Sequence, residues 1–197
     1  MFKNYEECPE CGHVLKEESV TNEIKKMRLK HREVYLFGEI DDYIMQDIIT
    51  EILYLDKLET KQITLYINSG GGTVGDGFAL IDVMKNVNSP IRTVGLGEVC
   101  SMACAIFVAG TKGLREVSKN TWFMFHPITS GMREDYVKFQ KSRVLQAEQL
   151  EKQYDQLILD NTKIPEQEYR KAKDTELWLP AKKVMEYEIA DKYYDGK

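Results

Sequence analysis

Histidine and cysteine are scarce in this 197-residue chain, which holds only three histidines and four cysteines. Four cysteines in a chain of this length, with a start too polar for a secretory signal peptide, do not predict a disulfide framework. No run approaches about 18 consecutive apolar residues, so the sequence predicts no membrane-spanning helix. The 27 basic and 32 acidic side chains nearly balance, and no field of one sign favours nucleic acid or an anionic membrane. These absences predict a soluble, cytoplasmic, globular protein without nucleic-acid or membrane partners.

The chain divides near Val34, where a regular apolar pattern begins. We interpret residues 1–33 as an N-terminal appendage, because they are polar and show no apolar periodicity. Residues 34–197 are then one folded domain, in which short apolar runs alternate with helical repeats. Strands are predicted over 34–37, 62–68, 91–97 and 122–125, and helices over the segments that follow the first three.

Nearly all-apolar strands that alternate with helices are typical of an α/β fold with a mostly parallel sheet flanked by helices. Asp41 and Asp42 are predicted to cap the first helix of this domain. Residues 132–161 contain no glycine or proline and predict one long helix. An element of that length on so small a domain must project or pack against another subunit.

Ser101 is the candidate nucleophile, because it follows a predicted strand and opens a predicted helix. A serine there can also be a small packing residue. However, a helix start supplies free N–H groups that stabilise an oxyanion, and the Gly70-Gly71-Gly72 turn after the neighbouring strand can supply another. The hydrolase elbow Gly-x-Ser-x-Gly is absent, as is the Gly-Lys-Ser/Thr ending of a phosphate loop.

His126 is the candidate general base, since it stands at the end of an apolar strand, where sites gather in a parallel sheet. His13 and His31 lie in the polar appendage instead. A nucleophile, a histidine and two backbone donors are the components of acyl transfer to water.

Three blocks of the sequence resemble the ClpP family, the proteolytic subunit of the bacterial Clp protease. They lie in order at the family's spacing, over a similarity that covers roughly residues 33–193, and read Tyr66-Ile67-Asn68-Ser69-Gly70-Gly71-Gly72, Gly97-Glu98-Val99-Cys100-Ser101-Met102 and Phe123-Met124-Phe125-His126-Pro127. Gly70 replaces a proline of the family. The resemblance implies a ClpP/crotonase-like fold, with the long helix from residue 132 as a protruding handle between two stacked heptameric rings.

The resemblance also implies the roles of the site residues. Ser101 would be the nucleophile and His126 the base, and the backbone N–H groups of Gly72 and Met102 would form the oxyanion hole. The third triad member is open between Glu176 and Asp174. Alignment register favours Glu176, two residues before Trp178, although the family has an aspartate there.

Other positions differ from the family's pattern. They indicate a divergent member of the family, encoded either by a phage or by a host. The arginine that accompanies the catalytic aspartate near the ring–ring contact of the family is missing around Glu176, which leaves a single heptameric ring as an alternative to the stacked pair. In the pocket that accepts the unfoldase's loops, Tyr66 fits, but Thr64 and Glu116 stand where apolar residues are expected.

A Cys8-x-x-Cys11 pair in the appendage is similar to one knuckle of a zinc ribbon. Tetrahedral zinc needs four ligands, and His13, His31 or a neighbouring subunit could complete the set. The alternatives are a solvated, reduced pair or an axial segment of the ring.

The sequence therefore predicts a serine endopeptidase subunit of a ring-shaped protease. It would cut unfolded polypeptides without a catalytic cofactor, fed by a Clp-type AAA+ ATPase. Two alternatives remain: a catalytically weak, structural or regulatory ring subunit of the same family, and an acyl-CoA enzyme of the crotonase fold.

Overall fold

The computed structural model describes residues 5–7, 14–16, 20–129, 136–171 and 174–196. Its main feature is a seven-stranded sheet in the order β3-β4-β5-β6-β9, with β7 paired to β5 and β8 paired to β7. All its pairs are parallel except β7 with β8. The strands are β3 (Glu33–Ile40), β4 (Ile63–Gly72), β5 (Ile91–Cys100), β6 (Arg115–Val117), β7 (Trp122–Phe125), β8 (Leu177–Pro180) and β9 (Lys192–Tyr193).

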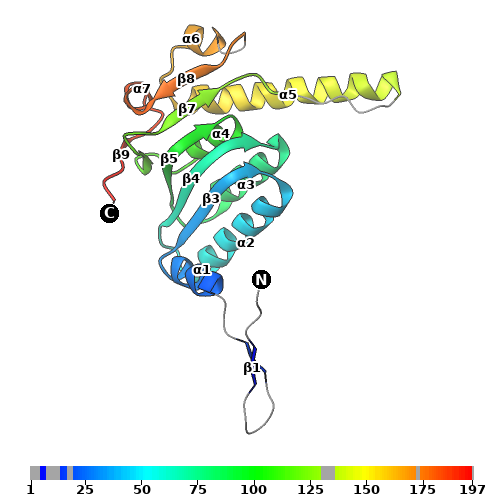
Figure 1. Ribbon diagram of the computed structural model, residues 1–197. Helices are drawn as coiled ribbons and strands as arrows, with labels where there is room; N and C mark the ends of the chain where they lie inside the picture. The colour runs from blue at the N-terminus through cyan, green and yellow to red at the C-terminus, as the bar shows by residue number, and fades with distance from the viewer. Residues whose placement is uncertain (1–4, 8–13, 17–19, 130–135, 172–173, 197) are drawn as a thin grey trace.

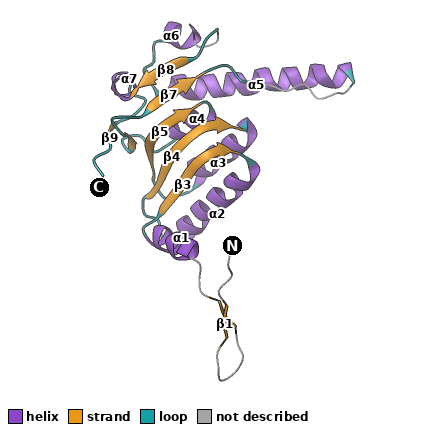
Figure 2. Cartoon of the chain, viewed as in Figure 1, coloured by secondary structure: helices purple, strands orange, loops and turns teal. Residues whose placement is uncertain are grey.

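Helices α2, α3 and α4 lie together on one face of this sheet (Figures 1 and 2). Near the chain start, β1 (Tyr5–Glu7) and β2 (Val14–Lys16) form a separate antiparallel hairpin. None of the helices in the described ranges is both long and apolar enough to span a membrane. The helices are α1 (Val20–Lys30), α2 (Asp42–Leu58), α3 (Val74–Asn86), α4 (Met102–Val108), α5 (Val137–Asn161), α6 (Glu166–Lys171) and α7 (Ala181–Glu186). The predicted α/β class with a mostly parallel sheet is confirmed.

Helix α2 begins as its capping residue predicts. The Asp41 side chain accepts a hydrogen bond from the Ile44 backbone N at 2.8 Å, which satisfies one of the free donors of the first turn. Ile48, Ile52 and Leu55 recur at helical spacing and are buried under the sheet. Burial of this apolar stripe holds the helix against β3.

The two faces of the sheet differ, because successive side chains of a strand point to opposite sides. Val34 and Leu36 are fully buried toward the helices. On the opposite face, Tyr35 stacks on Phe37 with ring centroids 5.3 Å apart, and Tyr66 meets Tyr35 edge to face at 5.3 Å. This second face is only partly covered within one chain.

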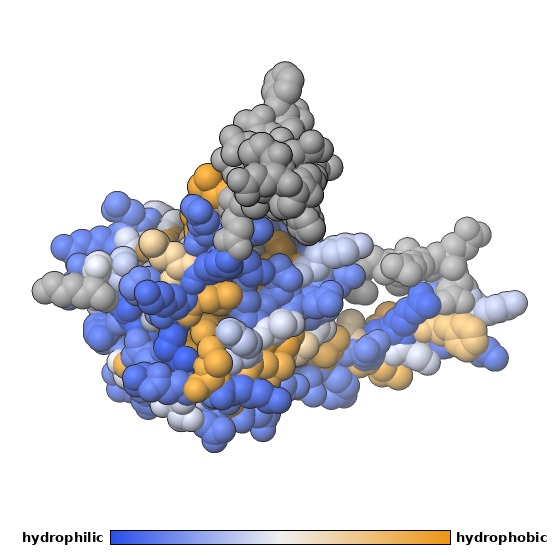
Figure 3. Space-filling view, turned by 90° about the horizontal axis from the view of Figure 1, so that it is seen from below, coloured by the Kyte–Doolittle hydropathy of each residue, from blue (hydrophilic) through white to orange (hydrophobic). Residues whose placement is uncertain are grey.

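Helix α5 is anchored at one end and projects at the other (Figure 1). Tyr154, Leu157 and Ile158 in its C-terminal half are buried. The long helix predicted over 132–161 is confirmed from Val137 onward, and residues 132–135 fall outside the described ranges. Hydrophobic side chains lie along the projecting half (Figure 3), and those with large exposed surfaces are Val137, Phe139, Val144 and Leu145.

Helix α1 was not predicted, because its residues lack a clear apolar repeat. Polar contacts hold it instead: Arg28 Nη2 donates to Glu51 Oε1 of α2 at 2.6 Å, and Lys25 Nζ lies 3.1 Å from the same oxygen. The Arg28 guanidinium also covers the ring of Tyr35 at 5.1 Å. Part of the predicted appendage thus packs on the domain, and the division at residue 33 stays a prediction.

A buried ion pair joins the C-terminal segment to β6. The Asp191 carboxylate accepts hydrogen bonds from Arg115 Nη2 at 2.6 Å, Arg115 Nε at 3.0 Å and the backbone N of Gly113 at 2.7 Å. Burial alone would raise the pKa of this carboxyl, but the hydrogen bonds from Arg115 and the charge of its guanidinium lower it. The pair therefore fixes the end of the chain beside β6.

Candidate active site

Ser101 occupies a sharp turn between β5 and α4. Its backbone has φ 54° and ψ −126°, a combination that non-glycine residues rarely adopt and that persists only when the surroundings enforce it. One contact that holds this conformation is a backbone hydrogen bond, in which the Ser101 N donates to the Met124 carbonyl of β7 at 2.8 Å. A strained strand-to-helix turn is the backbone that presents the nucleophile in hydrolase elbows, and here it forms without the Gly-x-Ser-x-Gly sequence.

The glycine segment lies directly against Ser101, and Gly71 makes the closest approach. A Cβ atom on Gly71 would lie 2.6 Å from Ser101 Cβ and 3.1 Å from the Met102 backbone N, at a φ of +96°. On Gly72 it would instead lie 2.3 Å from the Ile40 carbonyl oxygen of β3. The predicted turn is the end of β4, which continues to Gly72 and pairs with Ile40. The segment therefore lies beside the Met102 N–H, and Gly72 follows the point of contact.

His126 follows β7 immediately, and the pairing of β7 with β5 brings it near the level of Ser101. Cys100 pairs with Met124 across the parallel strands β5 and β7, so Ser101 and His126 leave neighbouring strands at the same edge of the sheet. The imidazole is partly exposed. Within the described residues no hydrogen bond joins His126 to Ser101 or Glu176, an arrangement that is common before substrate binding tightens catalytic contacts.

The antiparallel pairing of β7 with β8 separates the two candidates for the third position. Phe125 pairs with Leu177, and one further step in this register places Glu176 opposite His126. Asp174 lies two residues further along the chain. Glu176 Oε2 accepts a hydrogen bond from the Trp178 indole Nε1 at 2.8 Å. The register thus favours Glu176 as the neighbour of His126.

Two tryptophans border this arrangement on β7 and β8. Trp122 is 46% exposed and Trp178 is 42% exposed, and strand alternation places both on the face that carries Met124. Trp178 pairs with Met124, two residues before His126, and Trp122 lies two residues further from that end of β7.

The cysteines next to Ser101 are packing residues: Cys100 ends β5, Cys104 lies on α4, and both are buried. Cys104 is fully buried, and its thiol donates to the Val99 carbonyl at 3.0 Å. Burial raises the pKa of the Cys100 thiol to about 11, and the charges of Glu98 and Glu176 add to the effect. A protonated, buried thiol is a poor nucleophile, so Cys100 does not compete with Ser101 as the candidate nucleophile at this turn.

Within the described ranges, no three His, Cys, Asp or Glu side chains gather as a metal site would require. Cys8 and Cys11 lie outside the described residues, so zinc binding by this pair stays a prediction.

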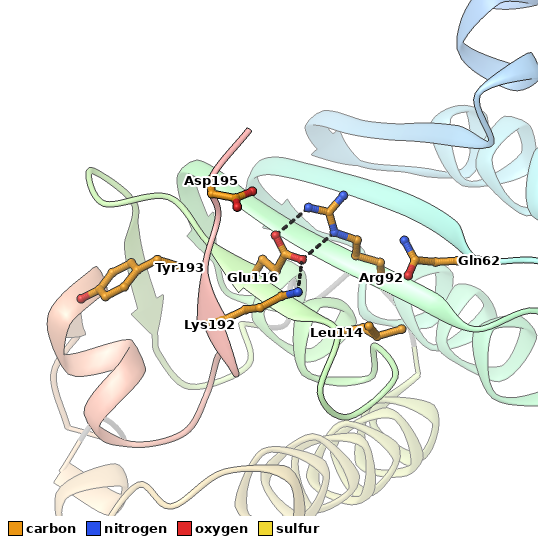
Figure 4. Close-up of a pocket in the computed structure, with 7 residues that line it drawn as sticks. All are labelled: Gln62, Arg92, Leu114, Glu116, Lys192, Tyr193 and Asp195. Carbon is orange, nitrogen blue, oxygen red and sulfur yellow. Dashed lines mark hydrogen bonds and ion pairs between the residues drawn. The ribbon is translucent and has the colours of Figure 1, made fainter. Parts of the chain in front are cut away.

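An ionic cluster occupies the region where the unfoldase pocket was predicted (Figure 4). Arg92 donates twice to Glu116, at 2.7 Å and 2.6 Å, and Lys192 Nζ lies 3.1 Å from the same carboxylate. Burial by itself would raise the pKa of Glu116, but the bonds from Arg92 and Lys192 lower it. These residues line a pocket of about 370 Å³, so polar groups form much of its wall.

Comparison with known proteins agrees with this geometry. The family model described as Clp protease matches residues 16–197. The ATP-dependent Clp protease proteolytic subunit of Lactococcus lactis is 32% identical over 172 residues, which cover 85% of each chain. The corresponding subunit of Streptococcus mutans is 31% identical over 85% of this chain and 87% of its own. Proteolytic subunit 2 of Treponema denticola is 32% identical over 83% and 82%. From these matches and the fold, the chain belongs to the Clp protease family.

Proposed function

We propose that this protein is a serine endopeptidase subunit that hydrolyses peptide bonds in unfolded polypeptides. One observation carries the proposal: Ser101 is held in a strained turn against the glycine segment, beside the strand end that bears His126. Strain of this kind marks sites where geometry serves chemistry. A residue that merely filled space would not need it.

In the proposed reaction, Ser101 Oγ attacks the carbonyl carbon of the scissile peptide bond while His126 accepts its proton. The negative charge that develops on the carbonyl oxygen is stabilised by the backbone N–H groups of Met102 and Gly72. The C–N bond then breaks, and His126 donates the proton to the leaving amine. Water, deprotonated by His126, hydrolyses the Ser101 ester and restores the enzyme.

Glu176 has the supporting role in this proposal. A carboxylate beside the imidazole fixes its tautomer and stabilises the imidazolium formed during attack. The β7–β8 register supports this assignment, because Phe125 pairs with Leu177 and one further step along both strands leads to His126 and Glu176. The Trp178 indole, which bonds to Glu176 Oε2, would limit the rotamers of the longer side chain.

Assembly into rings is the second part of the proposal. The projecting half of α5 exposes several large apolar side chains that one chain cannot cover, which supports self-association through this helix. The relatives are named as proteolytic subunits of an ATP-dependent protease. By analogy, this chain forms a heptameric ring in the cytoplasm, singly or in a stacked pair, and a Clp-type ATPase feeds it.

The Arg92–Glu116–Lys192 cluster restricts which docking loops of an ATPase could enter this pocket. An apolar loop entering the pocket would meet charged groups that are paired with each other, and burying them further would cost free energy. The cluster therefore supports an ATPase whose docking loops carry polar groups.

The test is covalent labelling of the purified full chain with a biotinylated fluorophosphonate, followed by intact mass measurement. We expect one adduct on Ser101 and hydrolysis of short peptides. Ser101→Ala should abolish both, with a loss of up to about 10⁶-fold in kcat. Ser118→Ala, in the loop between β6 and β7, is the matched control and should behave as the parent.

Labelling confined to another residue, or hydrolysis by Ser101→Ala near the parent rate, would refute the proposal. A parent that forms rings but neither labels nor hydrolyses would identify a structural ring subunit instead. Thioester turnover without peptide hydrolysis would identify an acyl-CoA enzyme.

A further inference from the structure

Tyr154 lies directly beneath the Ser101 turn. It belongs to the anchored half of α5, its side chain is only 4% exposed, and its hydroxyl donates to the Ser101 carbonyl oxygen at 2.9 Å. The Cys104 backbone N donates to the same oxygen at 2.9 Å. A carbonyl oxygen accepts two hydrogen bonds, so these two donors saturate it and fix its direction.

That carbonyl belongs to the peptide unit that also contains the Met102 N–H. A trans peptide is planar, and its C=O and N–H bonds point in opposite directions. Fixing the Ser101 oxygen on the side of α5 therefore aims the Met102 N–H toward the opposite side. The glycine segment lies there, because a Cβ on Gly71 would be 3.1 Å from the Met102 N.

The hydroxyl is suited to this task over a wide pH range. Burial raises the pKa of the Tyr154 phenol well above its usual value, so the group remains a neutral donor. The aromatic ring meanwhile packs in the core, which limits its movement.

We propose that Tyr154 is a positioning residue for the peptidase reaction: through the Ser101 carbonyl, its hydroxyl holds the Met102 N–H in the direction required of an oxyanion donor. The inference rests on the proposed function, in which Met102 N–H stabilises the tetrahedral intermediate. Without the hydroxyl, the Cys104 N alone holds the peptide unit, and the strained turn gains freedom to rotate.

The test compares Tyr154→Phe with Tyr169→Phe in the full chain. Tyr169 is a matched control, because it is 3% exposed and its hydroxyl donates to Asp155 of the same helix α5 at 2.9 Å. Both variants remove one buried tyrosine hydroxyl bond at α5, but only Tyr154 touches the Ser101 peptide unit. Each is measured for kcat, KM, melting temperature, and affinity for a peptide boronate and for the uncleaved peptide amide of the same sequence.

We expect Tyr154→Phe to lower kcat by roughly 10- to 100-fold with KM within about twofold, below the loss for deleting an oxyanion donor outright. Boronate affinity should weaken by a similar factor, because its tetrahedral oxygen occupies the oxyanion site, whereas amide affinity should not change. Tyr169→Phe should keep kcat within about threefold despite a similar fall in melting temperature. Replacing Tyr154 by 4-aminophenylalanine, which restores an N–H donor, should recover most of the lost kcat.

Equal effects of the two tyrosine variants on kcat, or a change in KM alone, would overturn the positioning role. If Tyr154→Phe does not fold, the 4-aminophenylalanine variant decides the matter: parent-like kcat and boronate affinity support the role, and loss of both in a folded protein contradicts it. The proposed function is judged separately, on Ser101 labelling and hydrolysis by the parent. A parent that fails those tests disproves the peptidase assignment, and the positioning role falls with it.

Discussion

Replacing Gly71 by alanine tests the close approach of the glycine segment to Ser101. The added Cβ would lie 2.6 Å from Ser101 Cβ and 2.8 Å from the Cys100 carbonyl oxygen, whereas carbon atoms in contact are ordinarily about 3.5 to 4.0 Å apart. The segment or the Ser101 turn must therefore move by roughly 1 Å. A φ of +96° adds about 1 to 2 kcal/mol of strain for a residue with a side chain.

The expected consequence for catalysis is larger than the consequence for stability. A displacement of about 1 Å at a reacting group can reduce a rate 100-fold, so Gly71→Ala should lower kcat by about that factor. A destabilisation of about 2 kcal/mol would lower the melting temperature by roughly 4 to 8 °C in a chain of this length. Peptide hydrolysis and thermal unfolding at one fixed protomer concentration measure the two effects.

Gly70→Ala is the matched control, one residue away. A Cβ on Gly70 meets no atom within 4 Å, and its φ is not positive. The family carries a proline at this position, which is consistent with room for a side chain there. Gly70→Ala should therefore keep the parent kcat, and equal activity of the two alanine variants would refute the packing argument.

Two further predictions concern the triad and acid stability. Glu176→Gln should lower kcat by several orders of magnitude and Asp174→Asn by less than about threefold, because the register places only Glu176 opposite His126; the reverse ranking in peptide hydrolysis would move the role to Asp174. Asp191→Asn should cost about 3 kcal/mol at pH 7 by leaving Arg115 buried without its counter-charge. The pKa of Asp191 is lowered in the folded state, so its contribution is complete above the ordinary carboxyl pKa near 4 and lost as the pH falls through the lowered value. In denaturant unfolding, the difference in unfolding free energy between Asp191→Asn and the parent should become smaller between pH 7 and pH 3. A difference that stays constant over this range would contradict the assignment.

The sequence predicted the elements whose signals are local. The Asp41 cap and the apolar repeat of Ile48, Ile52 and Leu55 specify α2 without reference to the rest of the fold. The strand at 122–125 and the long helix through Tyr154 were predicted for the same reason. The alternation of strands and helices also predicted that Ser101 and His126 each follow a strand of the sheet.

Features that depend on contacts distant in sequence were not predictable. Helix α1 is held by Arg28 on Glu51, 23 residues away, and leaves no apolar repeat to find. The glycine segment was expected to form a turn, yet pairing with Ile40 extends β4 through Gly72. The contact of Tyr154 with the Ser101 carbonyl spans 53 residues, and its only sequence signal was a hydroxyl-bearing residue on the buried stripe of a helix. The unusual backbone angles of Ser101 likewise depend on contacts that are distant in sequence. Met124 of β7 accepts its N–H, Tyr154 of α5 donates to its carbonyl oxygen, and the glycine segment of β4 packs against it.

The placement of the tryptophans gives the protein an optical reporter of its own. Its two tryptophans, Trp122 and Trp178, both lie on the paired strands β7 and β8, which border His126 and Glu176, and both are partly exposed to water. Light that excites tryptophan but not the eleven tyrosines therefore samples this region without background from the rest of the fold. A polypeptide lying across β7 and β8 would shield the indoles and move their emission to shorter wavelength. Arrival of substrate could thus be timed in unlabelled protein, before any bond is cut, with Ser101→Ala as the non-consuming host.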